Sequence, residues 1–105
     1  MLSYKAPLRD MRFVRDELLG FPALFASLPS CEEFTPDLID AILTEAAKFC
    51  EQVLAPLYRS GDEEGCTLTA HGVRAPAGFR EAYAQYVAGG WAALSSPAEY
   101  GGQGL

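Results

Sequence analysis

The side chains able to carry chemistry in this sequence are few, and most stand where a catalytic site is hard to build. Glu32-Glu33 and Asp62-Glu63-Glu64 are neighbouring carboxylates in polar stretches. Adjacent carboxylates on a loop or helix do not converge on one reacting atom, as paired acid–base catalysis requires. His71 is the only histidine, and no serine or cysteine is placed beside it by the sequence. We therefore expect solvated carboxylates and a histidine without a catalytic role.

The three cysteines do not follow a metal-binding or disulfide pattern. Cys31, Cys50 and Cys66 are odd in number and widely spaced, with no Cys-x-x-Cys pair. Reduced thiols in a cytoplasmic protein are the simplest account. The first residues lack the apolar segment of a signal peptide, and no apolar run has the length needed to cross a bilayer. We thus expect a cytoplasmic protein with no metal and no transmembrane segment.

The charge of the chain is −6 overall but is positive at its start. Residues 1–15 contain four basic residues and one acidic residue, whereas residues 16–105 contain four basic and thirteen acidic residues. An acidic body argues against nucleic-acid binding, because phosphates require Lys and Arg. The basic start is expected to be a solvated first helix turn, or else a segment that docks on acidic protein surface.

The last residues are rich in glycine, with the sequence GGQGL at 101–105. A phosphate-cradling loop needs a strand before it and a helix after it, because the helix amino end supplies the N–H donors. Neither is predicted, so the segment taken by itself is a flexible tail. Because nothing caps or covers Leu105, we expect this domain to have been cut from a longer chain.

Hydrophobic spacing predicts helices for most of the chain. Asp10 is expected to cap a helix that Gly20 ends, with an apolar face of Met11, Val14 and Leu18, and a second short helix covers residues 21–28. Thr35-Pro36 has the signature of a cap and first helical residue. The widest apolar stripe follows it, so Ile42, Phe49 and Val53 are expected to be almost fully buried. Their helix should kink or end at Pro56, with Leu57 and Tyr58 placed to continue the same face.

The second half of the chain is more punctuated. Residues 59–78 are expected to form loops, in which residues 66–69 can pair with 73–74 as a hairpin. A further helix covers residues 79–88 and stops at Gly89-Gly90. The predicted fold class is all-α, a small bundle of about four helices, with or without that short hairpin between the third and fourth.

Several segments, taken in order, resemble the N-terminal helical domain of flavin-dependent acyl-CoA dehydrogenases. Gly90-Trp91, Leu94 and PAEYGGQGL at 97–105 are similar to the segment that closes that domain. Ala98 is a departure, since the pattern often has Glu there. Residues 4–13, 47–49, 53–57, 60–66 and 76–83 are similar to a bacterial branch that includes large fatty-acyl-CoA and methylthiopropanoyl-CoA dehydrogenases.

The resemblance implies an enzyme of three parts, with a middle β domain and a C-terminal helical domain after this one. Such enzymes oxidise an acyl-CoA to the enoyl-CoA with FAD and pass electrons to an electron-transfer flavoprotein. The catalytic glutamate and most flavin contacts lie in the two missing domains, so no catalytic or cofactor-binding residue is assigned and the fragment is expected to be inactive. Residues 1–33 would be an N-terminal extension and residues 34–105 the helical domain.

The same resemblance places candidate functional residues at the end of the chain. These residues, near the acyl-chain cavity and the domain junction, are Pro97, Glu99, Tyr100, Gly101 and Gly102. The plainer alternative is a turn between domains, with glycines for positive φ. A homo-oligomer is also expected, with Trp91, Leu94 and Tyr100 on its contact surface. The alternative function is a non-catalytic helical module for protein interaction.

Overall fold

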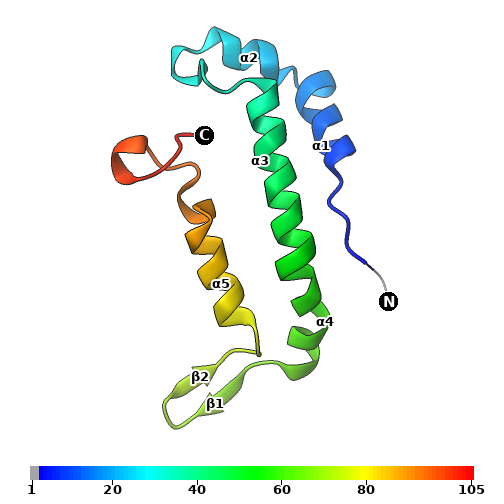
Figure 1. The fold of residues 1–105 in the computed structure, drawn as a ribbon, viewed down its shortest axis with the longest axis vertical. Coiled ribbons are helices and arrows are strands. Elements are labelled where there is room, and N and C mark those ends of the chain that lie inside the picture. Colours follow the sequence, from blue (N-terminus) through cyan, green and yellow to red (C-terminus); the bar gives the residue numbers. More distant parts are fainter. Residues whose placement is uncertain (1–2) are drawn as a thin grey trace. The chain divides into compact units, whose positions relative to one another are not determined.

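The computed structural model describes residues 3–105, and most of them are helical (Figure 1). The predicted class of a small helical domain with a short hairpin is confirmed. The chain divides into two compact units, which meet in sequence between Glu51 and Gln52. This division does not test the expected boundary between an N-terminal extension and the helical domain at residues 33 and 34. That boundary stays a prediction.

The first unit begins with helix α1, Leu8–Phe13, which continues as a π-helical turn, Val14–Leu18. The expected cap at Asp10 is wrong. Pro7 is the residue before the helix, and Asp10 lies inside its first turn. Proline lacks an N–H donor and restricts φ, so the helix can begin directly after it. Gly20, at φ 62°, ends the segment as predicted, and α2, Phe21–Ser27, follows.

The expected apolar face of the first helix is exposed. Met11, Val14 and Leu18 have exposed fractions of 41%, 41% and 67%. The buried residue is Arg15, at 7%. The π-helical turn alters the angular spacing of residues 14–18, so the 3.6-residue period used for the prediction does not hold there.

Arg15 is the centre of an ionic cluster in the first unit. Its Nη2 donates to Asp16 Oδ2 at 2.7 Å, and its Nη1 lies 2.9 Å from Asp40 Oδ1 on helix α3, Pro36–Phe49. Arg12 Nε also donates to Asp40 Oδ1, at 3.3 Å. The basic start of the chain is therefore partly paired within its own unit, because these two arginines contact carboxylates there. Docking of this segment on acidic protein surface stays a prediction.

We expect this cluster to make the stability of the protein sensitive to acid. Hydrogen bonding from Arg15 lowers the pKa of Asp16 and of Asp40, although partial desolvation opposes the shift. A carboxyl group with a lower pKa in the folded state contributes stability above its unfolded pKa, and this is lost as the pH falls through the folded pKa. The free energy of unfolding should therefore fall below about pH 4, the ordinary range for aspartate. Urea unfolding from pH 2.5 to 7 would measure this, and an equal acid slope in Asp40→Asn would contradict the assignment.

Helix α3 begins where the sequence predicts. Thr35 Oγ1 accepts the N–H of Leu38 at 3.2 Å, so Thr35 is the cap and Pro36 the first helical residue. The helix does not end at Pro56. It passes through a π-turn, Cys50–Leu54, into α4, Ala55–Glu64. In a regular α-helix the proline ring would meet the carbonyl four residues earlier, and the wider π-turn relieves this clash. The expected loop at residues 59–64 is therefore helical.

The expected deep core is also corrected. Ile42, Phe49 and Val53 are half-buried, and no side chain among residues 3–105 is fully buried. The most buried apolar side chains are small, with Ala47 at 7% and Ala82 at 5%. The sequence does contain the wide apolar stripe, but the larger side chains of this stripe are only partly buried in the structure.

Half-burial changes the expected cost of truncating Phe49. We expect Phe49→Ala to lower the free energy of unfolding by about 1–2 kcal/mol, below the range of about 3–5 kcal/mol for a fully buried aromatic. Urea unfolding of the variant and the parent chain would measure the difference. A loss above about 3 kcal/mol would show that this face is covered in solution.

The second unit contains the predicted hairpin and final helix. Strand β1, Thr67–Thr69, pairs antiparallel with β2, Gly72–Arg74. Its cross-strand pair Leu68–Val73 is exposed at 82% and 70%. Helix α5, Phe79–Ala88, has the predicted bounds, and Gly90 follows at φ 79°. Within residues 3–105, none of the helices combines the length and apolar character that crossing a bilayer requires.

Candidate functional site

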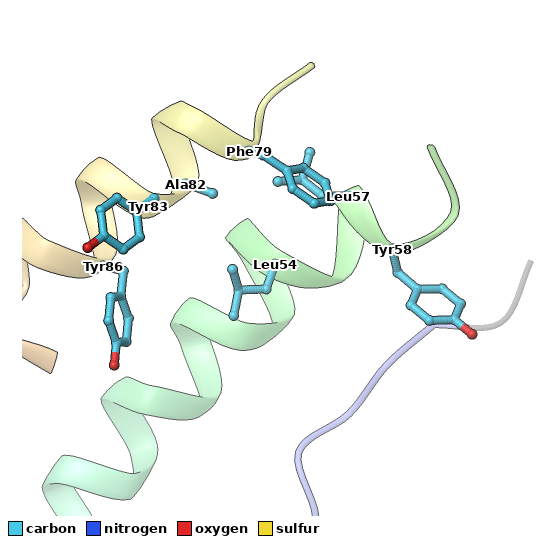
Figure 2. Close-up of a pocket in the computed structure, with 7 residues that line it drawn as sticks. All are labelled: Leu54, Leu57, Tyr58, Phe79, Ala82, Tyr83 and Tyr86. Carbon is cyan, nitrogen blue, oxygen red and sulfur yellow. The ribbon is translucent and has the colours of Figure 1, made fainter. Parts of the chain in front are cut away.

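An apolar pocket of about 400 Å³ lies between α4 and α5 in the second unit (Figure 2). The pocket is lined by Leu54, Leu57, Tyr58, Phe79, Ala82, Tyr83 and Tyr86. Tyr83 and Tyr86 are roughly stacked, with ring centroids 6.3 Å apart. Because Tyr58 and Tyr83 are 84% and 67% exposed, the pocket is an open groove.

Two glycines allow the side chains of this groove to approach the backbone. A β-carbon on Gly61 of α4 would lie 2.5 Å from Cζ of Phe79. A β-carbon on Gly78 would lie 2.7 Å from Cδ2 of Leu57, and Gly78 also has φ 87°, which favours glycine. Both glycines were predicted only as loop residues. Gly61 instead provides space for an aromatic ring against a helix.

The chemistry of the groove is limited to apolar contact. Its lining residues include no acid, base or cation, and their polar groups are phenol hydroxyls. Such a surface suits another apolar surface and gives no ligand for a phosphate. The sequence already indicated that Leu57 and Tyr58 continue the apolar face beyond Pro56. It did not indicate that this face meets the helix at residues 79–88.

The predicted candidate residues come together in one closed turn at the end of the chain. Pro97 leads into a 3₁₀ turn, Ala98–Tyr100, which Gly101 ends at φ 85°. The N–H of Gly102 then donates to the carbonyl of Pro97 at 3.1 Å. The side chains of Glu99 and Tyr100 are exposed to solvent, and the exposed fraction of Tyr100 is 77%. The turn geometry is thus clear, while the functional role of these residues stays a prediction.

The glycine-rich end is a folded loop, which corrects the expectation of a flexible tail. Gly104 N–H donates to Ser96 O at 2.9 Å, and Leu105 N–H donates to Leu94 O at 3.2 Å. A β-carbon on Gly102 would lie 1.9 Å from the same Ser96 oxygen. Gly102 is therefore needed for close backbone approach, a role that residue type alone did not reveal.

The expected contact surface is only partly exposed. Trp91 begins a 3₁₀ turn, Trp91–Ala93, and both Trp91 and Leu94 are half-buried. A β-carbon on Gly89 would lie 2.8 Å from Trp91 Nε1, so the indole rests against the end of α5. Self-association through these residues stays a prediction.

The remaining candidates have structural surroundings. His71 is exposed in the hairpin turn, and its backbone N–H donates to Thr69 Oγ1 at 3.2 Å. Glu63 pairs with Arg59 at 2.8 Å, and Glu64 accepts the N–H of Ala77 at 3.0 Å. The cysteines are free, and the part of the chain described by the structure has no group of His, Cys, Asp or Glu side chains placed to hold a metal ion.

Over 99% of its length, this chain is similar to a protein of the acyl-CoA dehydrogenase class. That relative is the 3-methylmercaptopropionyl-CoA dehydrogenase of Ruegeria pomeroyi (strain ATCC 700808 / DSM 15171 / DSS-3), which is 41% identical over 104 residues. The chain spans 18% of the length of this relative. No family model matches the chain. The predicted resemblance is therefore confirmed, and the short coverage is consistent with a single domain.

Proposed function

We propose that this chain is the N-terminal helical domain of a flavin-dependent acyl-CoA dehydrogenase that acts on acyl-CoA thioesters. The observation that carries the proposal is 41% identity along almost the whole chain to an enzyme of which this chain spans only 18%. The reaction would be α,β-dehydrogenation, in fatty-acid or related acyl-CoA oxidation. We expect the whole protein to be cytoplasmic and to pass electrons to an electron-transfer flavoprotein.

FAD would supply the hydride acceptor in the whole enzyme, but the residues that line the groove of this chain do not fit it. The groove between α4 and α5 presents hydrocarbon and phenol groups, with no cation to meet a pyrophosphate. We therefore place no flavin in this groove and derive no redox step through its residues. The chain by itself should be colourless and inactive.

The proposed contribution of this domain is at its closing loop. Pro97, Glu99, Tyr100, Gly101 and Gly102 would lie at the junction with the middle domain and near the acyl group. Their closed turn and exposed Tyr100 support a contact surface more than a catalytic one. The turn holds its shape through backbone hydrogen bonds, which suits a role in positioning.

The amount of exposed surface supports the view that more protein covers this chain. Within the second unit, Tyr58, Leu68 and Val73 are exposed at 84%, 82% and 70%, and Tyr83 and Tyr100 at 67% and 77%. Large apolar or aromatic side chains that stay this exposed favour a further protein surface against them. The same exposure favours the alternative function, a helical module that binds another protein.

The test compares the product of the complete gene with residues 1–105 alone. The complete protein should be yellow and should reduce an artificial electron acceptor with 3-methylmercaptopropionyl-CoA or a fatty acyl-CoA, whereas residues 1–105 should do neither. A reading frame that stops after Leu105 would favour the interaction module. Stoichiometric flavin in the short chain would contradict the assignment of the cofactor to other domains.

Oligomerisation can be measured separately through Trp91. We expect the fluorescence maximum of the short chain to shift on dilution from about millimolar to micromolar, because aromatic residues are enriched at interface cores. Light scattering provides the mass at each concentration. A constant maximum and a monomeric mass throughout would leave Trp91 as a residue packed only within its own chain.

A further inference from the structure

The long helix from Pro36 to Glu64 departs from α geometry at the π-turn Cys50–Leu54. The division of the chain into two compact units falls inside this turn. A π-turn widens the backbone, and such turns are frequent at functional positions in helices. Pro56 follows closely and has no N–H to give to the helix. The continuous helix therefore changes its hydrogen-bond pattern, and loses the one N–H that Pro56 lacks, next to the point where the compact units change.

The same turn is tied to the start of the chain. Glu51 Oε1 accepts the N–H of Ala6 at 2.9 Å, and Glu51 Oε2 lies 3.6 Å from Lys5 Nζ. The Glu51 side chain is only 24% exposed, so the hydrogen bond is partly shielded from water. Pro7 restricts Ala6 to extended backbone and leads directly into α1. A carboxylate of the turn thus holds a segment that is distant in sequence.

We propose that the π-turn Cys50–Leu54 is a hinge and that residues 3–7, held by Glu51, are its latch. With the latch closed, Glu51 is fixed to the segment before α1, and bending is confined to the turn after it. With the latch open, Glu51 no longer holds the segment before α1, and the first residues of the π-turn lose these two contacts. Local opening of the helix should then become more frequent without unfolding of either unit.

Amide hydrogen exchange, followed residue by residue by NMR in the 105-residue chain, tests the hinge. Amides of residues 52–55 should exchange at least about tenfold faster than those of residues 42–47 within α3. The comparison needs no substitution, so it does not depend on whether a variant folds. Equal protection along the whole helix from Pro36 to Glu64 would overturn the hinge.

Two variants test the latch. Glu51→Ala removes the acceptor, and Lys5→Glu places a like charge opposite Glu51 while leaving the helix sequence intact. Lys5 is 79% exposed, so its replacement disturbs little packing. Both variants should raise the exchange rate of amides 52–55 about tenfold or more, with amides 79–88 of α5 unchanged.

The matched control is Glu45→Ala, which removes an exposed carboxylate of α3 that pairs only locally with Lys48 at 2.6 Å. Exchange at residues 52–55 should stay at the parent rate in this variant. An equal increase in the control, no increase in the two latch variants, or faster exchange throughout α5 would each overturn the latch. The last result would mean general destabilisation.

Discussion

Replacing Arg15 with alanine should lower the free energy of unfolding by about 2–3 kcal/mol, a large share of the stability of a domain of this size. Arg15 is 7% exposed, and it lies among Phe21, Pro22, Phe25 and Phe34. Its removal would take away apolar packing of the side-chain stem and the hydrogen-bond partner of two aspartates. Because Asp16 and Asp40 keep some contact with water, the cost should be smaller than for a fully buried ion pair.

Arg12 provides the matched control for this prediction. It also pairs with Asp40, but its side chain is 52% exposed. We expect Arg12→Ala to cost less than about 1 kcal/mol, as is usual for an exposed ion pair. Urea unfolding at pH 7 would compare the two variants with the parent chain. Similar losses for both would show that burial of Arg15 does not contribute.

The second large effect is expected for Gly102→Val in the closing loop. The new β-carbon would lie 1.9 Å from Ser96 O and 2.6 Å from Ala93 O. These are backbone atoms, so a change of rotamer cannot relieve the contact. We expect the loop to open at a local cost of about 2–4 kcal/mol, comparable to severe overpacking. Loss of protection at the amides of Gly104 and Leu105 would report the opening.

A comparison of Gly101→Ala with Gly102→Ala separates the two reasons for glycine in this loop. Gly101 has φ 85° but open space around its α-carbon, so alanine should cost about 1–2 kcal/mol from backbone strain. Gly102→Ala meets the steric conflict and should cost more. A protected loop in Gly102→Ala, measured by hydrogen exchange at residue 104, would contradict the close approach.

Local rules predicted the elements whose causes are local. The cap at Thr35 needs only a side-chain oxygen and the next turn of helix, and it forms as expected. The bounds of α5 follow from its apolar spacing and from Gly89-Gly90. The hairpin follows from short β-prone runs around a glycine turn. In each case the residues that decide the structure are neighbours in sequence.

Predictions failed where local rules allow more than one outcome, or where a partner distant in sequence decides it. Pro56 breaks an isolated helix, but a π-turn before it lets α3 continue into α4. Gly61 then becomes a helical contact for Phe79, and no local pattern distinguishes this from a loop glycine. Arg15 was expected near solvent because its partner Asp40 is distant in sequence. The apolar groove was missed for the same reason, since it depends on both α4 and α5.

The candidate loop was found through family resemblance, and its geometry could not be read from composition. Residues 101–104 are rich in glycine, which indicates flexibility when nothing else is known. The carbonyls of Leu94 and Ser96 supply the acceptors that order the segment. Those acceptors belong to a turn formed after Trp91, so the order of the end depends on the fold of the residues before it.

The half-buried side chains have a calorimetric consequence. No side chain among residues 3–105 is fully buried, so unfolding newly hydrates less apolar surface than in a typical protein of this length. The heat-capacity increment should fall below the usual value of about 1.2–1.5 kcal/mol/K per 100 residues. The enthalpy and entropy of melting should be correspondingly small and the thermal transition broad. For a domain of this size, a loss of 1 kcal/mol usually lowers the melting temperature by about 4–8 °C. In this protein, the same loss should lower it by more.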